Sequence, residues 1–173
     1  CLQAAQWREN GCPDFTLAVN LSARQFRRKD LVSFVAETLR DTGYPAHLLE
    51  LEITESSLMH NVDEVIQTLH RLVALGVRLA IDDFGTGFSS LTYLKNLPFD
   101  ELKIDHSFIV DITTNPTSAS IVEATIDLGK SLGLTVITEG VETQEQLKLL
   151  VQAGCQLFQG YVFHKPLPLE AFE

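Results

Sequence analysis

The stretch VRLAIDDFGTG, residues 77–87, joins an alternating apolar pattern to two acids and a glycine-containing loop. The pattern has two faces: Val77, Leu79 and Ile81 share one, and Arg78, Ala80 and Asp82 share the other. In a barrel of parallel strands, one set of alternate residues packs against the helices and the other fills the interior. The stretch therefore predicts a parallel strand whose inward face ends in Asp82.

Five other short segments rich in Leu, Ile or Val repeat this pattern, at residues 15–20, 48–53, 101–105, 134–139 and 157–159. Helical patterns separate them. Residues 31–42 end before Gly43, residues 62–75 end before Gly76, and a third pattern runs from about Pro116 to Gly133, each glycine being suited to a left-handed C-terminal cap. Thr143 and Gln146 form a capping box for a last helix. This alternation predicts an α/β fold with a parallel sheet, either open and doubly wound or closed as a barrel.

The inward sets of all six segments end in polar residues, which favours the barrel. These residues are Asn20, Glu52, Asp82, Lys103, Glu139 and Gln159. Parallel strands bring their carboxyl ends to one rim, where barrel enzymes carry their chemistry. We therefore expect a (β/α)8 TIM-like barrel with about six of its eight strands present. Since residues 1–10 read as a helix, the chain is predicted to be one domain, residues 1–173, that lacks its N-terminal strands.

The composition fits a soluble domain and excludes some partners. The chain has 173 residues, 45% of them hydrophobic, and a net charge of -10. A long nucleic acid needs a basic face to displace its counterions, so we expect no such partner. No apolar run is long enough to span a bilayer, and three widely spaced cysteines fit a reducing compartment, so a cytoplasmic location without membrane contact is expected.

The predicted rim offers only oxygen donors for a metal ion: Asn20, Glu52, Asp82, Asp83 and Glu139. Such donors suit hard cations, Mg²⁺ or Mn²⁺, and two ions close together would clamp the oxygens of a phosphoryl displacement. Lys103 would stabilise developing negative charge or orient the water. Taken singly, Glu52 or Asp82 is more often a helix cap or a solvated loop residue, Asn20 can be a turn former, and Lys103 is more often a surface residue. Their shared parity and position favour a site.

Six ordered motifs in the chain resemble the EAL domain family. They are Val19-Asn20-Leu21-Ser22, Glu52-Ile53-Thr54-Glu55, Asp82-Asp83-Phe84-Gly85-Thr86-Gly87, Leu102-Lys103-Ile104-Asp105, Glu139-Gly140-Val141-Glu142 and Gln159-Gly160-Tyr161. The resemblance runs nearly end to end. It implies a barrel with two Mg²⁺ or Mn²⁺ ions that hydrolyses cyclic-di-GMP to the linear dinucleotide pGpG, in a homodimer whose parent chain carries upstream sensory or GGDEF-type domains.

The resemblance also implies a role for each matched residue. Asn20, Glu52, Asp82, Asp83 and Glu139 match metal-binding positions, with Asp83 serving both ions and Glu139 alternatively acting as general base. Lys103 matches the residue that holds the water, and Gln159 matches a position that supports the metal and water network. Glu55 matches the acid that braces the Asp-Asp-Phe-Gly loop.

Two departures from the family pattern concern catalysis. The Glu-Ala-Leu tripeptide that names the family, whose glutamate is a metal ligand, is absent from this sequence, as is the nearby arginine that would contact a substrate phosphate. His106 stands where Arg or Lys is common, a change we expect to matter little. The isolated chain is therefore expected to turn over poorly. Two alternatives remain open: a catalytically inactive EAL domain acting as a cyclic-di-GMP receptor, and an enzyme for another phosphoester.

Overall fold

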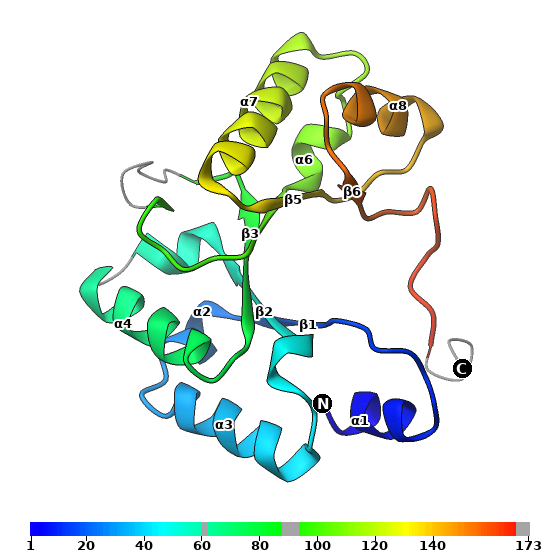
Figure 1. The fold of residues 1–173 in the computed structure, drawn as a ribbon. Coiled ribbons are helices and arrows are strands. Elements are labelled where there is room, and N and C mark those ends of the chain that lie inside the picture. The colour runs from blue at the N-terminus through cyan, green and yellow to red at the C-terminus, as the bar shows by residue number, and fades with distance from the viewer. Residues whose placement is uncertain (60–61, 88–93, 169–173) are drawn as a thin grey trace. The chain divides into compact units, whose positions relative to one another are not determined.

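The structure is a computed structural model that describes residues 1–59, 62–87 and 94–168. It divides into two compact units, Cys1–Glu101 and Leu102–Glu173, and Figure 1 shows helices and strands alternating along the chain. The first unit contains α1 (Leu2–Glu9), β1 (Leu17–Leu21), α2 (Ala23–Phe26), α3 (Leu31–Thr42), η1 (Ala46–Leu48), β2 (Leu49–Thr54), η2 (Glu55–Met59), α4 (Val62–Val73) and β3 (Arg78–Phe84). The second contains β4 (Glu101–Ile104, starting at the last residue of the first unit), α6 (His106–Ile109), α7 (Pro116–Leu132), β5 (Thr135–Thr138), α8 (Gln144–Gln152) and β6 (Leu157–Phe158).

The strands of the first unit are parallel and follow the chain order β1-β2-β3. The register pairs Asn20 of β1 with Glu52 of β2, and Thr54 of β2 with Asp82 of β3. Residues on both faces of β2 are buried, and Ile53, Leu79 and Ile81 are fully so. Two buried faces are what a parallel strand requires, because its crossover helices cover the sheet. The expected parallel α/β class is therefore confirmed.

The second unit repeats the pattern over shorter strands. Its strand order is β4-β5-β6, with β5 parallel to β6, and Thr138 is the register partner of Phe158. The amide of Glu139 donates to the carbonyl of Ile104 at 3.2 Å, which fixes the segment after β5 beside the end of β4. No helix in the described ranges is long and apolar enough to cross a membrane.

The helix ends follow the sequence signals closely. Helix α3 has the predicted bounds, and Gly43 and Gly133 cap α3 and α7 in the left-handed conformation, at φ 65° and 75°. Thr143 and Gln146 form the predicted capping box of α8. Helix α4 ends earlier than predicted, at Val73. The amide of Gly76, which has a φ of 88°, donates to the Val73 carbonyl and so closes a turn after the helix.

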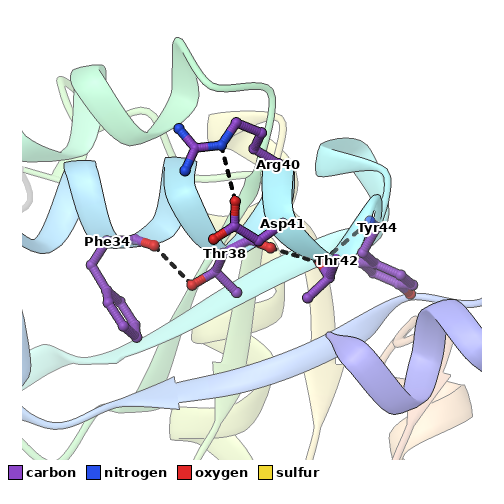
Figure 2. Close-up of polar contacts among 6 residues, drawn as sticks. All are labelled: Phe34, Thr38, Arg40, Asp41, Thr42 and Tyr44. Atoms are coloured by element: carbon purple, nitrogen blue, oxygen red, sulfur yellow. Dashed lines mark hydrogen bonds and ion pairs between the residues drawn. The ribbon is translucent and has the colours of Figure 1, made fainter.

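The C-terminal end of α3 is tied to the segment before β1. Figure 2 shows that the hydroxyls of Thr38 and Thr42 each bond the carbonyl four residues earlier, at 2.8 and 2.7 Å, with Tyr44 following the helix. The Tyr44 hydroxyl donates to the Phe15 carbonyl at 2.9 Å. We predicted that the first strand begins at residue 15, which is wrong: β1 begins at Leu17, and the Phe15 carbonyl bonds a side chain instead of a neighbouring strand.

Replacing Tyr44 by Phe is expected to lower the free energy of unfolding by about 0.5–1.5 kcal/mol, because a hydrogen bond is lost and the Phe15 carbonyl loses its donor. Urea unfolding at neutral pH measures this effect. Burial raises the pKa of Tyr44, so the neutral phenol stabilises the fold below about pH 10, and this contribution is lost as the pH rises further. Tyr161→Phe, at an exposed tyrosine, is the matched control. Equal unfolding curves for the two variants would contradict the assignment.

Candidate functional site

Oxygen donors lie at the carboxyl ends of the three strands in the first unit. Asn20 on β1 and Glu52 on β2 are register partners, so their side chains leave neighbouring strands at the same level. Asp82 pairs with Thr54, two residues beyond Glu52, so it lies farther along the same strand face. Glu52 and Asp82 are buried, whereas Asn20 is exposed. The structure thus places three predicted ligands on adjacent strands, although at two levels.

Asp83 leaves β3 in an unusual backbone conformation. Its φ of 54° makes it the one non-glycine residue with a positive φ in the part of the chain that the structure describes. Its amide donates to the Asp82 carboxylate at 3.0 Å. Consecutive strand residues normally point to opposite faces, and the left-handed turn ends that alternation at Asp83. Strained backbone of this kind is concentrated at functional sites, which supports a role for the acid pair beyond a plain turn.

Glu55 fixes the glycine loop that follows this acid pair. It is 1% exposed, and its Oε2 accepts hydrogen bonds from the amides of Gly85 at 3.0 Å and Gly87 at 3.1 Å. A Cβ at position 87 would lie 2.9 Å from Glu55 Oε1, so only glycine allows this approach without a shift. Glu55 therefore contacts the loop directly, through two backbone amides. Its contribution to catalysis stays a prediction.

The second unit pairs a buried lysine with a half-buried carboxylate. Lys103 on β4 is 4% exposed, and its Nζ lies 2.5 Å from Oε1 of Glu139, the first residue after β5. The short separation indicates a charge-assisted hydrogen bond, which compensates the burial of the ammonium group. The two residues that sequence reasoning assigned to water positioning and to metal binding or base chemistry are therefore in direct contact.

Gln159 follows β6 and is exposed, but its backbone is held firmly. Its amide donates to the Thr138 carbonyl at 2.8 Å, and its carbonyl accepts from the Val141 amide at 3.0 Å. A Cβ on Gly160 would lie 2.1 Å from the Val141 carbonyl oxygen, so glycine is needed for this approach. The Gln-Gly and Glu-Gly-Val motifs are thus packed together by their backbones.

Two arrangements near the predicted residues were not found from the sequence. Arg78 Nη2 lies 3.6 Å from Glu50 Oε2 and 3.7 Å from Glu101 Oε2, which explains why two acids face inward near the amino ends of their strands. Gly140, at φ 67°, lies so close to the His106 ring that a Cβ would overlap it. The inward parity of Arg78 and Glu101 was a usable signal for the first arrangement, whereas nothing in the sequence indicated the second.

The donor set fits a hard divalent cation by its chemistry, since every predicted ligand offers oxygen and none offers sulfur or imidazole. Within residues 1–59, 62–87 and 94–168, no three His, Cys, Asp or Glu side chains are grouped closely enough to hold a metal ion. Asn20, Glu52, Asp82 and Asp83 belong to the first unit and Glu139 to the second. The metal-binding assignment of these five residues therefore stays a prediction.

These features define a class before they define a family: an α/β protein with parallel strands that carry acids, an amide and a paired lysine at or near their carboxyl ends. The chain matches the family described as EAL domain over residues 1–166, and it belongs to that family.

Relatives and solved structures agree with this assignment. A protein named cyclic di-GMP phosphodiesterase NbdA, from Pseudomonas aeruginosa, is 50% identical over 157 residues, covering 91% of this chain and 20% of its own length. A solved structure described as PaMucR phosphodiesterase in a c-di-GMP complex superposes with a TM-score of 0.96 at 43% identity, covering 100% of this chain and 70% of that one.

A manganese and cy-diGMP complex of Klebsiella pneumoniae BlrP1 has a TM-score of 0.84 at 32% identity, covering 95% of this chain and 42% of that one. The barrel-type fold of the EAL family is thereby shown. The chain spans only about a fifth of the length of the curated relatives it matches.

Glu55→Ala is expected to expose the amides of Gly85 and Gly87 to solvent exchange. Losing a hydrogen bond to a charged acceptor costs about 1.5–3 kcal/mol, which corresponds to about tenfold faster exchange or more at both glycines. Hydrogen exchange followed by mass spectrometry measures this change. Glu37→Ala, at an exposed acid on α3, is the control that leaves both amides protected. Unchanged exchange in the Glu55 variant would show that other contacts hold the loop.

Proposed function

We propose that this chain takes part in the metal-dependent hydrolysis of cyclic-di-GMP to pGpG in bacterial second-messenger signalling. The observation that carries the proposal is an oxygen donor at every residue that matches a metal-binding position by resemblance, namely Asn20, Glu52, Asp82, Asp83 and Glu139. A domain kept only for binding would be free to lose these costly, like-charged groups. The relatives named as phosphodiesterases support the same reading.

Hydrolysis requires water to add to a phosphorus atom while one phosphate ester bond breaks and the leaving oxygen takes a proton. The contact between Lys103 and Glu139 suits the first part of this task. Lys103 can donate a hydrogen bond to the attacking water or to a phosphate oxygen, while the carboxylate of Glu139 can accept the proton of the water. Gln159, on the backbone-packed loop after β6, is proposed to orient the water network.

The metal ions are proposed to be Mg²⁺ or Mn²⁺, held by Asn20, Glu52, Asp82 and Asp83, with Glu139 serving either as a further ligand or as the base. Neighbouring EAL structures hold manganese and calcium, which agrees with a divalent, oxygen-seeking ion. When bound, such ions withdraw electron density from phosphate oxygens and lower the pKa of coordinated water. Glu55 is proposed to support the ligands indirectly, since it holds Gly85 and Gly87 in the loop next to Asp82 and Asp83.

The second candidate function is a receptor that binds cyclic-di-GMP without cleaving it. The intact donor set favours the enzyme. Comparing binding with turnover distinguishes the two functions, and a panel of other phosphodiesters tests the remaining alternative.

The setting of the reaction is also a proposal. We infer a cytoplasmic domain that acts as a homodimer and is joined in its parent chain to sensory or GGDEF-type domains. Relatives that match most of this chain are several times longer, and one is named a bifunctional diguanylate cyclase and phosphodiesterase. The acidic net charge of this chain makes long nucleic acids poor partners.

Glu139→Gln in the full-length protein is expected to lower kcat by about 10²-fold or more, the range for loss of a catalytic proton acceptor. The isosteric amide retains a hydrogen bond acceptor for Lys103 but cannot take a proton from water. Hydrolysis of cyclic-di-GMP with Mn²⁺, read as pGpG by chromatography, measures the effect, and calorimetry measures binding. Glu142→Gln is the matched control and should retain activity, because Glu142 lies three positions after Glu139 and its side chain is exposed. Binding without turnover in the wild-type protein would establish the receptor instead.

Removing divalent ions with EDTA is expected to abolish pGpG formation, and adding Mn²⁺ or Mg²⁺ is expected to restore it. Because a ligand that binds only the folded state stabilises it, Mn²⁺ should also raise Tm in a concentration-dependent way. Differential scanning fluorimetry gives this second readout without any turnover. A Tm that is unaffected by Mn²⁺ over a wide concentration range, together with hydrolysis that survives EDTA, would overturn the metal proposal.

A further inference from the structure

The chain is acidic overall, yet one short segment of it is strongly basic. Four of its 13 Lys and Arg residues lie at positions 24–29, and that segment contains no acid. It covers α2 and the start of the connection to α3. The catalytic roles described above use none of these residues. A local reversal of charge in a chain with a net charge of -10 calls for a separate explanation.

Three of these four basic residues, all but Arg24, line a groove in the first unit, formed by α2, the connection to α3, the first turn of α3, η2 and α4. Its volume is about 380 Å³. Four of its lining side chains are basic and one is acidic: Arg27, Arg28, Lys29 and Arg71 against Glu64. Phe26, Val65 and Ser57, which also line it, are buried. We call this the α3–α4 groove. In Figure 1 the helices that form it lie together in the blue to green part of the chain.

The charge excess of the groove rests on three of the four cations. The guanidinium of Arg28 bonds both carboxylate oxygens of Asp30, at 2.9 and 2.6 Å, and lies 5.7 Å from the centre of the Phe34 ring. Its hydrogen bond lowers the pKa of the Asp30 carboxyl, which keeps the pair ionised and close to neutral in sum. Arg27, Lys29 and Arg71 therefore outweigh Glu64.

We propose that the α3–α4 groove is a docking surface for an acidic polypeptide segment that carries an apolar side chain. The charges of Arg27, Lys29 and Arg71 favour carboxylates, and a complementary field of this kind both attracts and selects a partner. The half-buried Val32, with Phe26 and Val65 beneath it in the lining, gives an apolar side chain a place to pack. A small free anion would use the charges but leave the apolar part of the groove unfilled.

The groove also touches the element that holds the acid loop. The hydroxyl of Ser57 lies 2.7 Å from that of Thr54, whose register partner is Asp82. Two residues before Ser57, at the start of the same short helix η2, Glu55 binds the amides of Gly85 and Gly87. An occupant that shifts Ser57 therefore acts on the segment that fixes the loop. Docking itself does not depend on the proposed function, whereas its effect on hydrolysis does.

The test is selection of a random 12-residue peptide library on the full-length protein, with counter-selection on the variant Arg27→Glu/Arg71→Glu. The expected peptides are rich in Asp and Glu and contain an aliphatic or aromatic residue. Fluorescence anisotropy should show at least about tenfold weaker binding to the charge-reversed protein. It should also weaken when NaCl rises from about 0.1 M to about 1 M, where the Debye length falls from about 10 Å to about 3 Å.

Arg40→Glu is the matched control, because this substitution reverses a charge on α3 at a residue that does not line the groove. Its guanidinium bonds Asp41 at 2.9 Å on the exposed part of the helix, as Figure 2 shows. This variant should bind the selected peptides like the wild type, and circular dichroism verifies that all variants fold. Failure to obtain any peptide that distinguishes wild type from Arg27→Glu/Arg71→Glu would overturn the proposal. The proposal would also be overturned if millimolar pyrophosphate displaced the peptides and if replacing their apolar residue left binding unchanged. That result would identify a small-anion site.

Coupling to the loop is read separately, by hydrogen exchange at Gly85 and Gly87 with and without a selected peptide. We expect the exchange rate of these amides to change by about threefold or more when the peptide binds, and we expect no such change in Ser57→Ala. The reason is that Ser57 lines the groove and, as part of η2, contacts Thr54. Unchanged exchange with a bound peptide would overturn the coupling and leave the docking surface standing. Neither readout depends on hydrolysis, so a failure of the proposed function would be recognised independently by the pGpG assay.

Discussion

Charged side chains on the buried faces of parallel strands require partners, and this constraint shapes both units. Taking an unpaired carboxylate or ammonium out of water is strongly unfavourable. In the first unit, Arg78 lies between Glu50 and Glu101 near the amino ends of the strands. In the second, Lys103 is matched by Glu139. Removing Arg78 would leave two buried carboxylates, and removing Glu139 would leave a buried ammonium group, so these residues limit which substitutions the strands tolerate.

Glu55 meets the same requirement with backbone groups. Its buried carboxylate accepts hydrogen bonds from the amides of Gly85 and Gly87, and these bonds offset the free-energy cost of burying the charge. They also restrict a loop whose glycines allow many backbone conformations. This loop follows the end of β3, where Asp83 has a left-handed backbone that is itself unfavourable for a residue with a side chain. The strained backbone lowers the free energy of unfolding at the strand end that carries Asp82 and Asp83, which is typical of a functional site. The α3–α4 groove touches η2 at Ser57, two residues after Glu55, and the proposed docking would act on this arrangement from there.

Much of the fold was predictable because its signals are local. The bounds of α3, the caps at Gly43 and Gly133, and the box formed by Thr143 and Gln146 depend on neighbours within about four residues. Strand ends were predicted less well. Strand β1 begins at Leu17 and not at Phe15, because the Phe15 carbonyl accepts a hydrogen bond from Tyr44, a residue 29 positions away. Helix α4 was overestimated because Gly76 closes a turn after the helix instead of capping it directly. The family itself was evident from six short motifs in order, which a single strand end could not have shown.

The sequence by itself determined the parallel α/β class, the helix caps, the family and the identity of the oxygen donors, because alternation and residue type are local properties. The tertiary structure decided which side chains meet. Pairing of Lys103 with Glu139, and of Glu55 with two glycine amides, joins residues about 30 or more positions apart, and only the strand register brings them within hydrogen-bond distance. The groove has the same origin: Arg27, Lys29 and Arg71 form one basic surface only because α3 packs against α4.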